Sequence, residues 1–346
     1  MEKLLTIVVP AFNMEKYLRR CIDSICIESV MNRVQVIVVN DGSKDRTSEI
    51  AHEYEQKYPH YIQVIDKENG NYGSCMNVGL SLAKGKYFRT LDADDWYNTD
   101  AYEKFVKELE KTDADMILCE RHEYHEMTGE MKDYLFDQSL QLSQDIQVKK
   151  QLLEVANIRE KALVTSICYK TEIMRDCHLA WSEGVFYTDT EYDYFPLKMI
   201  KTIRLVPLPV YIYLIGRNEQ SVSSESIKKN FNSFYIVTKR ILNDFITSSN
   251  TEDDVYEWQQ MHLIRILRFV YQSLLFHGKK YEKQIEELDK LVCQMPELYK
   301  KTNTIDSYRS YYYVDAYRHN KVKFWLIRLD YMIRTNKIMR KLFSRH

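Results

Sequence analysis

Three carboxylates crowd into four positions of the segment KYFRTLDADDWY, residues 86–97. They are Asp92, Asp94 and Asp95, and they directly follow an apolar run with the character of a β-strand. Crowding like charges costs free energy unless a positive group lies among them. A single aspartate at such a place is commonly a solvated turn or a helix cap. Three of them favour a cation site, and oxygen ligands suit Mg²⁺ or Mn²⁺, which often also contact substrate phosphates.

The first 120 residues contain the elements that must position this cluster. Short apolar runs alternate with segments of helical spacing, the first of which is 14–30. The runs expected to be strands are residues 4–9, 34–40, 61–65, 86–91 and 115–120. This alternation predicts an α/β fold with a mainly parallel sheet that helices cover on both faces. Ligands of such sheets bind beyond the carboxyl ends of the strands. Polar loops follow three of the expected strands, at 10–13, 40–43 and 92–95, so we expect them to form one site.

Two shorter motifs leave alternatives open. Asp41-Gly42-Ser43 reads either as an ordinary helix start, with Ser43 as the N-cap of a helix over 43–58, or as a contact to a nucleotide base or ribose. The glycine-rich segment 69–73 lacks both GxGxxG and GxxxxGK[ST]. This disfavours a Rossmann dehydrogenase and a P-loop enzyme.

Composition excludes several classes of protein. The net charge of −1 gives no overall field that would attract nucleic acid. The seven cysteines are scattered without a CxxC pair, which argues against a disulfide framework or a zinc site and for a reducing compartment. The amino terminus lacks a signal-peptide pattern, and no apolar run approaches the roughly 18–20 residues that span a bilayer. We therefore expect a cytoplasmic protein, and contact with the inner face of the cell membrane stays open.

Five segments of the chain together resemble bacterial, non-processive members of glycosyltransferase family 2. They are TIVVPAFNMEKYLRRCIDSI, VIVVNDGSKDRTSEIA, KENGNYGSCMNVGLSLAKGKYFRTLDADDW, GVFYTDTEYDYFPLKMIK and PVYIYLIGRNEQSVS. The resemblance implies the GT-A fold of nucleotide-diphospho-sugar transferases, a mixed, mainly parallel sheet flanked by helices. It implies a GT-A domain at 1–222, with a nucleotide-sugar half at 1–120 and an acceptor and catalytic-base half at 121–222. Residues 223–346 would form a helical C-terminal region outside the resemblance.

The resemblance also assigns roles to single residues. Asp41 matches the aspartate that hydrogen-bonds the uracil edge, and Asp92 and Asp94 match the DxD pair, with Asp94 the expected direct metal ligand. The family more often has Tyr where this chain has Phe12. The full set expected to bind the nucleotide-sugar is Pro10, Ala11, Phe12, Asn13, Glu15, Asp41, Gly42, Gly70, Asn77, Asp92, Asp94 and Arg217.

The expected general base is Asp189, which falls where the family usually has a Glu-Asp pair. Here Thr188 precedes it instead of Glu, and that departure leaves Glu191 or Glu183 as alternative bases. The chain also lacks the Gln-x-x-Arg-Trp signature of processive synthases.

The resemblance, together with the acidic cluster, implies an inverting enzyme that uses Mn²⁺ or Mg²⁺ and moves one sugar from a UDP-sugar to an acceptor hydroxyl. The acceptor would be a saccharide or lipid-linked saccharide in bacterial surface polysaccharide or glycoconjugate assembly. One alternative is a catalytically silent relative that binds a nucleotide-sugar or a partner, which the Thr188 departure favours. The other is a sugar nucleotidyltransferase, although PAFNMEKY is not the glycine-rich, basic loop that such an enzyme would have after its first strand.

The segment 321–346 predicts a basic amphipathic helix. It holds eight Lys or Arg against one Asp. Its apolar residues fall on one stripe: Val322, Trp325, Leu326, Leu329, Met332, Ile333, Met339 and Phe343. Such a helix can lie on an anionic membrane or pack on the domain or a partner chain. Both readings stay open, as does a homodimer.

Overall fold

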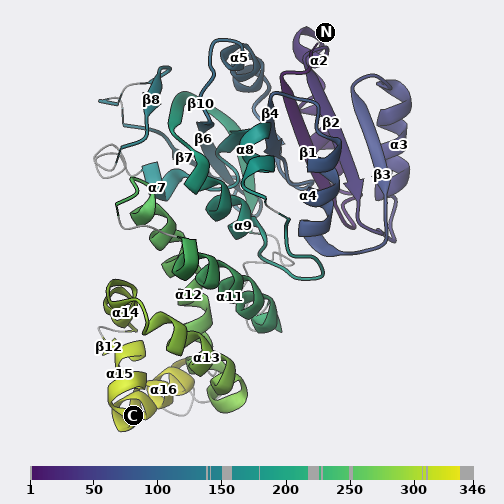
Figure 1. Ribbon diagram of the computed structural model, residues 1–346. Coiled ribbons are helices and arrows are strands. Elements are labelled where there is room, and N and C mark those ends of the chain that lie inside the picture. The colour runs from purple at the N-terminus through teal and green to yellow at the C-terminus, as the bar shows by residue number, and fades with distance from the viewer. Residues whose placement is uncertain are drawn as a thin grey trace. The chain divides into compact units, whose positions relative to one another are not determined.

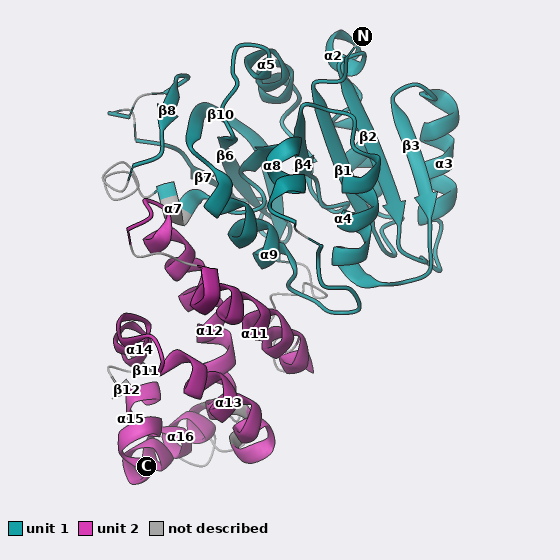
Figure 2. Ribbon diagram, viewed as in Figure 1, with its two compact units in different colours: residues 1–220 teal, residues 221–346 magenta. Residues whose placement is uncertain are grey.

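The computed structural model describes residues 2–137, 139–140, 142–149, 158–178, 180–216, 226, 229–248, 252–305, 307–308 and 311–335. The chain divides into two compact units, Met1–Gln220 and Ser221–His346 (Figure 2). Each unit has its own set of buried apolar side chains.

The first unit is built on one mixed sheet. Its strands are β1 (Leu5–Ala11), β2 (Val34–Asn40), β3 (Ile62–Asp66), β4 (Tyr87–Thr90), β5 (Trp96–Tyr97), β6 (Met116–His125), β7 (Met131–Tyr134), β8 (Asp145–Gln147), β9 (Ile167–Lys170) and β10 (Thr202–Ile215). Their order is β3-β2-β1-β4-β9-β6-β10-β5, while β7 pairs with β6 and β8 with β10. Neighbours β3-β2-β1-β4 are parallel, and so are β6 and β10, whereas β9 runs antiparallel between β4 and β6. The expected mixed, mainly parallel sheet is therefore confirmed.

Helices cover this sheet because its central strands are apolar on both faces; β2 is buried along its whole length. The helices of this unit are α1 (Leu18–Asp23), α2 (Glu28–Met31), α3 (Thr47–Lys57), α4 (Asn71–Leu82), α5 (Thr99–Leu109), α7 (Ile158–Lys161), α8 (Thr171–Asp176) and α9 (Asp189–Tyr194). A 3₁₀ helix, η1 (Phe195–Met199), follows α9. Helix α4 packs on β1 and β2, α3 on β2 and β3, and α5 on β10 (Figure 1).

Two local expectations were wrong. The helical spacing over 14–30 is interrupted, because α1 stops at Asp23 and the Ser24 hydroxyl accepts a hydrogen bond from the main chain of β5. Ser43 does not cap a helix, since α3 begins only at Thr47 and the Ser43 hydroxyl accepts from the Asn13 N–H.

The second unit is helical. Its elements are α11 (Phe231–Ser248), α12 (Tyr256–His277), the 3₁₀ helix η2 (Gly278–Tyr281), α13 (Glu282–Val292), α14 (Pro296–Asn303), α15 (Tyr313–His319) and α16 (Lys321–Thr335). A short ladder of β11 (Ser307–Tyr308) and β12 (Tyr311–Tyr312) was not expected from the sequence. Arg318 of α15 links its helix to two others of this unit, since its guanidinium donates to Asp289 of α13 and to the Tyr271 hydroxyl of α12.

Candidate functional site

The three aspartates after β4 form one oxygen-rich cluster. Each of Asp92, Asp94 and Asp95 offers a carboxylate oxygen, and these oxygens lie within 4.8 Å of one another. Asp94 and Asp95 are buried, and Asp92 is half-buried. The Asp95 N–H donates to the Asp92 carbonyl at 2.9 Å, which closes a tight turn. Closely spaced carboxylate oxygens are a suitable donor set for a hard divalent cation.

Asp95 connects this turn to the opposite part of the sheet. One oxygen accepts from the Tyr211 hydroxyl at 2.6 Å, and the other accepts from the Leu214 N–H at 2.7 Å. Burial, followed by the charges of Asp94 and Asp92, raises the pKa of Asp95 well above its usual range. Asp95 therefore anchors the turn to β10, and Asp92 and Asp94 are better suited to hold a metal ion.

Arg20 of α1 is a positive group beside this cluster. Its guanidinium donates to the main-chain carbonyl of Asp94 at 2.9 Å and lies 3.7 Å from the centre of the Trp96 ring. Burial lowers the pKa of Arg20, while the nearby charges of Asp95, Glu126 and Asp94 oppose that effect. Sequence reasoning missed Arg20, because nothing in the local pattern of α1 links it to a turn so far along the chain.

A second arginine lies deeper in the same unit. Arg89 of β4 is fully buried, and its guanidinium carbon lies 4.9 Å from the Tyr97 ring centre and 5.8 Å from that of Tyr211. It donates to the Thr165 carbonyl at 2.7 Å. Because the hydroxyl of Tyr211 also binds Asp95, the Tyr211 ring connects this buried cation to the acidic turn.

The loops after β1 and β2 are hydrogen-bonded to each other. Asn13 adopts a positive φ of 55°, and its side-chain oxygen accepts from the Lys44 N–H at 2.8 Å. Glu15 accepts from the Arg46 N–H at 3.1 Å. The side chains of Asn13 and Glu15 therefore hold the two loops together, while Phe12 at the tip of the first loop is exposed.

Asp41, at the end of β2, is buried beside a lysine. One of its oxygens accepts from the Lys67 ammonium at 2.8 Å and from the Gly70 N–H at 2.9 Å. Gly42 has a positive φ of 74°, which a side chain would disfavour. Lys67 was missed in the sequence, although a lysine one residue after β3 could have been noticed beside the other polar strand ends.

Asn77 of α4 contacts a loop far along the chain. Its amide donates to the Trp181 carbonyl at 3.0 Å and accepts from the Trp181 N–H at 2.8 Å. It also donates to the carboxylate of Glu183 at 2.8 Å. A Cβ at Gly73 would come within 2.1 Å of the Ser182 carbonyl, so the loop lies directly on α4. In this structure Asn77 and Gly73 therefore position the loop 181–184.

Asp189 is the first residue of α9 and is half-buried. Burial and, to a smaller extent, the charge of Glu191 raise the pKa of Asp189. The pKa values of Tyr72 and Tyr213 are raised, mainly by burial. The negative charges of Asp92 and Asp189 add to this effect at both tyrosines. The carboxylates of Asp92 and Asp189 therefore both affect the pKa values of these two tyrosines.

The alternative bases have other contacts. Glu191 is fully buried, and its two oxygens accept from the N–H and the hydroxyl of Ser182 at 2.8 and 2.7 Å. Glu183 accepts from Asn77. Both carboxylates therefore help to hold the loop 181–184. Arg217 lies outside the described residues.

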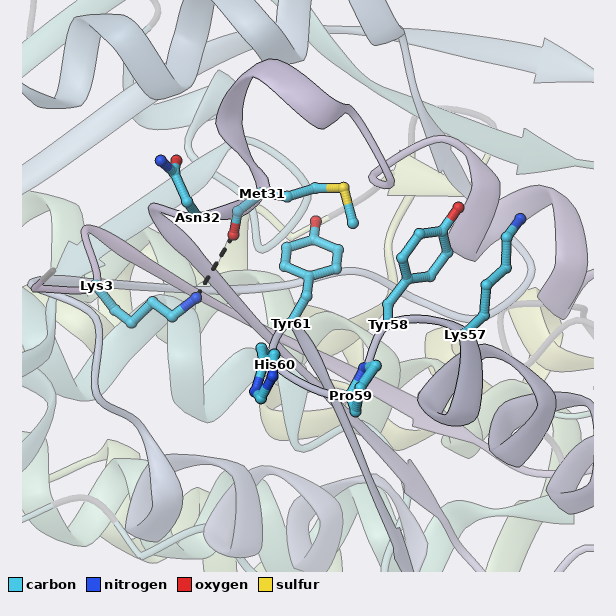
Figure 3. Close-up of a pocket in the computed structure, with 8 residues that line it drawn as sticks. All are labelled: Lys3, Met31, Asn32, Lys57, Tyr58, Pro59, His60 and Tyr61. Carbon is cyan, nitrogen blue, oxygen red and sulfur yellow. Dashed lines mark hydrogen bonds between the residues drawn. The ribbon is translucent and has the colours of Figure 1, made fainter.

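A hollow of about 520 Å³ lies at the other edge of the sheet (Figure 3). It is lined by Lys3, Met31, Asn32, Lys57, Tyr58, Pro59, His60 and Tyr61. Because Lys3 precedes β1 and Tyr61 precedes β3, this hollow lies at the amino ends of the parallel strands. It is separate from the acidic cluster, which follows the carboxyl end of β4.

Comparison with known proteins identifies the family. Residues 6–175 match the family model described as Glycosyl transferase family 2. Glycosyltransferase GlyA of Streptococcus pneumoniae serotype 4 is 30% identical over 164 residues, which are 47% of this chain and 23% of GlyA. The minor teichoic acid biosynthesis protein GgaB of Bacillus subtilis (strain 168) is 35% identical over 115 residues, which are 32% of this chain and 13% of GgaB. This chain thus spans less than a quarter of each of these two relatives.

The structure resembles that of S. aureus TarS 1–349, solved in complex with UDP-GlcNAc. The TM-score is 0.66 at 16% identity, over 95% of this chain and 91% of that one. At this identity the likeness concerns the fold, and the fold of the first unit is the GT-A fold. With the match across residues 6–175, these findings show that this part of the chain is a domain of glycosyl transferase family 2.

Proposed function

We propose that this chain is an inverting, metal-dependent glycosyltransferase that moves one sugar from a UDP-sugar to an acceptor hydroxyl. The observation that carries the proposal is the cluster of carboxylate oxygens within 4.8 Å of one another after β4. Strand β4 is parallel to β1, and β1 is parallel to β2, so the cluster shares a sheet edge with the loops of Asn13 and Asp41.

The donor nucleotide is proposed to bind along these loops. Asp41 would accept from the uracil edge, and Lys67 fixes the Asp41 side chain from the other side at 2.8 Å. Gly42 and Gly70 are proposed to lie beside the nucleotide. In the structure they give room to neighbouring protein atoms, since a Cβ would lie 3.0 Å from the Asn69 nitrogen at Gly42 and 2.7 Å from the Ser74 hydroxyl at Gly70. The complex of the structurally similar TarS with UDP-GlcNAc supports a nucleotide-sugar as the donor class.

Asp94 and Asp92 are the proposed ligands of Mn²⁺ or Mg²⁺. Their oxygen donors fit such an ion, and Asp95 and Arg20 fix the turn that presents them. When bound, the ion would offset the negative charge that develops on the departing diphosphate.

Asp189 is the proposed general base. It would take the proton of the acceptor hydroxyl as that oxygen attacks the anomeric carbon from the face opposite the diphosphate, which inverts the anomeric centre. Its raised pKa brings its basicity closer to that needed near neutral pH. Glu191 is a weaker candidate because both of its oxygens accept from Ser182.

Donor binding is proposed to lie in residues 1–120, and the acceptor site and the base in residues 121–222. The name of GgaB supports a role in bacterial surface polysaccharide assembly, with a free or lipid-linked saccharide as the acceptor. The reaction is proposed to occur in the cytoplasm.

A catalytically silent, nucleotide-sugar-binding relative is the second candidate. Thr188 favours this candidate, because the family usually has the Glu of a Glu-Asp pair at this position. The Thr188 side chain is fully buried. Donor turnover separates the two candidates, because a silent relative would bind UDP without releasing it from a UDP-sugar.

A panel of UDP-sugars tested with Mn²⁺ or with EDTA would examine the proposal. A true donor should raise the melting temperature only when Mn²⁺ is present, because ligand binding stabilises the folded state by mass action. Asp94→Asn should lose both this shift and UDP release, whereas Asp100→Asn, a matched change at an exposed aspartate of α5, should keep both. UDP binding without turnover would support the silent relative. A shift that survives both EDTA and Asp94→Asn would contradict the metal site.

A further inference from the structure

Helix α16 carries an apolar stripe on the side turned away from its own unit. The helix packs against α12 and α15, and Ile327, only 4% exposed, lies on the packed side. The Phe324 ring, on the same side, lies 5.4 Å from the ring of Tyr317 in α15. Ile327 is two positions from Trp325 and two from Leu329, and two positions turn a helix through about 200°. Trp325 and Leu329 therefore point almost directly away from the packed side.

Five large apolar side chains lie on this outer side. Their exposed fractions are 71% for Val322, 57% for Trp325, 54% for Leu326, 38% for Leu329 and 46% for Met332. Their spacing of three or four residues, or multiples of it, places them in one continuous stripe along the helix. Single exposed apolar residues need no explanation, but a contiguous stripe marks a surface that binds something.

Basic residues border the stripe on both sides. Helical geometry puts Lys321 and Arg328 along one border, and Lys323 and Arg334 along the other. The Arg334 guanidinium is paired with Asp330 at 2.8 Å. Four basic residues less one acidic residue give α16 a net charge of +3.

We propose that α16 lies flat on an anionic lipid surface, with Trp325, Leu326 and Leu329 in the boundary between headgroups and acyl chains. An in-plane helix buries its apolar face there, while long basic side chains on its borders reach the lipid phosphates. The charge of the helix complements that of an anionic leaflet, and each basic residue near such a surface strengthens binding roughly five-fold. None of the described helices has the length and apolar character needed to cross a bilayer, so the contact would be peripheral.

The charge pattern favours lipid over a second copy of this chain. In a two-fold dimer the same patch meets itself. Stripe-to-stripe packing would then bring the basic borders of one α16 against those of the other. An anionic leaflet instead offers opposite charge on both sides of the stripe.

Vesicle flotation of the full chain tests the proposal. We expect binding to vesicles of phosphatidylcholine with 30% phosphatidylglycerol, at least ten-fold weaker binding to pure phosphatidylcholine, and release by 0.5 M salt. Brominated acyl chains should quench fluorescence in the wild type and not in Trp325→Phe, because Trp181 and Trp258 are buried and Trp96 is half-buried in the first unit.

Two pairs of variants separate the apolar and the charged contributions. Trp325→Ser with Leu326→Ser should abolish binding, whereas Ile236→Ser, at an exposed apolar residue of α11, should not. Lys321→Gln with Lys323→Gln should weaken binding at least five-fold, whereas Lys283→Gln with Lys290→Gln, at exposed residues of α13, should leave it unchanged. Circular dichroism and melting temperature verify that each variant is folded.

Two results would overturn the proposal. One is the absence of flotation with anionic vesicles. The other is self-association that Trp325→Ser with Leu326→Ser abolishes, which would assign the stripe to a second copy. Flotation needs neither donor nor metal, so it tests the membrane proposal independently of the proposed sugar transfer. A failure to float would not contradict sugar transfer, and an absence of sugar transfer would not contradict membrane binding.

Discussion

The three aspartates of the acidic turn differ in what they contact. Asp95 is fully buried and uses both oxygens to accept from Tyr211 and from the main chain of Leu214, so it fixes the turn. Asp94 is held by Arg20 through its main-chain carbonyl, a contact that does not occupy its carboxylate. This arrangement explains how a cluster of like charges can be maintained at the end of a buried strand.

Arg20→Lys should loosen the turn while keeping the charge. A lysine ammonium cannot both stack on Trp96 and donate in the fork geometry of a guanidinium. We expect a loss of about 1–3 kcal/mol in the free energy of unfolding and several-fold weaker Mn²⁺ binding. Urea denaturation and Mn²⁺ titration by electron paramagnetic resonance measure these effects. Arg19→Lys, at a surface arginine paired with Glu53, is the matched control and should change neither. An unchanged Mn²⁺ affinity in Arg20→Lys would show that Arg20 does not position the turn.

Asp189→Asn should reduce sugar transfer while sparing donor binding. Loss of a general base lowers the rate by roughly 10²–10⁴. Since the pKa of Asp189 is raised and a base acts only when deprotonated, activity should fall with decreasing pH at values above those of an ordinary aspartate. Steady-state kinetics across pH 4–8 would reveal this acid limb. A flat profile in the wild type, or full activity of Asp189→Asn, would assign the base to another group.

Among the residues of the site, the sequence predicted only those that lie close together along the chain. The spacing of Asp92, Asp94 and Asp95 is visible within four residues. The groups that hold them are distant in the chain, since Arg20 precedes Asp94 by 74 positions and Tyr211 follows Asp95 by 116. Only the fold brings such residues together, so no local pattern could predict them.

Among the elements, short contacts between distant loops build the site. Asn77 of α4 binds the main chain of Trp181, 104 positions away, and Glu191 of α9 binds Ser182 in the same loop. The apolar runs of the sequence predicted the strands well, because β1 and β2 are buried nearly throughout. Hydrophobic periodicity could not predict that α1 ends at Asp23, where the next residue, Ser24, accepts a hydrogen bond from the distant Tyr97 N–H.

His52 of α3 should make stability depend on pH. Hydrogen bonds to Asp66 of β3 and to Glu55, at 2.7 and 2.8 Å, raise the pKa of His52 in the folded protein. The resulting stabilisation is fully present below the unfolded-state pKa, about 6.5, and is lost as the pH rises through the higher folded-state value. The side chain is partly exposed, so we expect less than about 1 kcal/mol.

The measurement is the free energy of unfolding of His52→Gln against wild type between pH 5.5 and 8.5. The difference should be largest at pH 5.5 and shrink toward pH 8.5. A difference for His52→Gln that grows with pH would contradict the assignment.

At the scale of the whole molecule, the first unit could be predicted from the sequence far better than the second. Parallel strands and the helices that cover them appear in the sequence as apolar runs that alternate with segments of helical spacing. The position of β9 between β4 and β6 has no such pattern, because it depends on pairing between distant segments. The second unit is visible in the sequence only as helices. Its packing around Arg318, which contacts Asp289 and Tyr271, has no sequence signature.

The central claim is that the acidic turn after β4 holds a divalent ion against a diphosphate. Anomalous diffraction from crystals grown with UDP and Mn²⁺ tests it most directly. The account predicts one manganese peak within coordination distance of the Asp94 carboxylate, with UDP phosphate oxygens on its other side. A manganese peak elsewhere, or UDP bound away from this turn, would contradict the account.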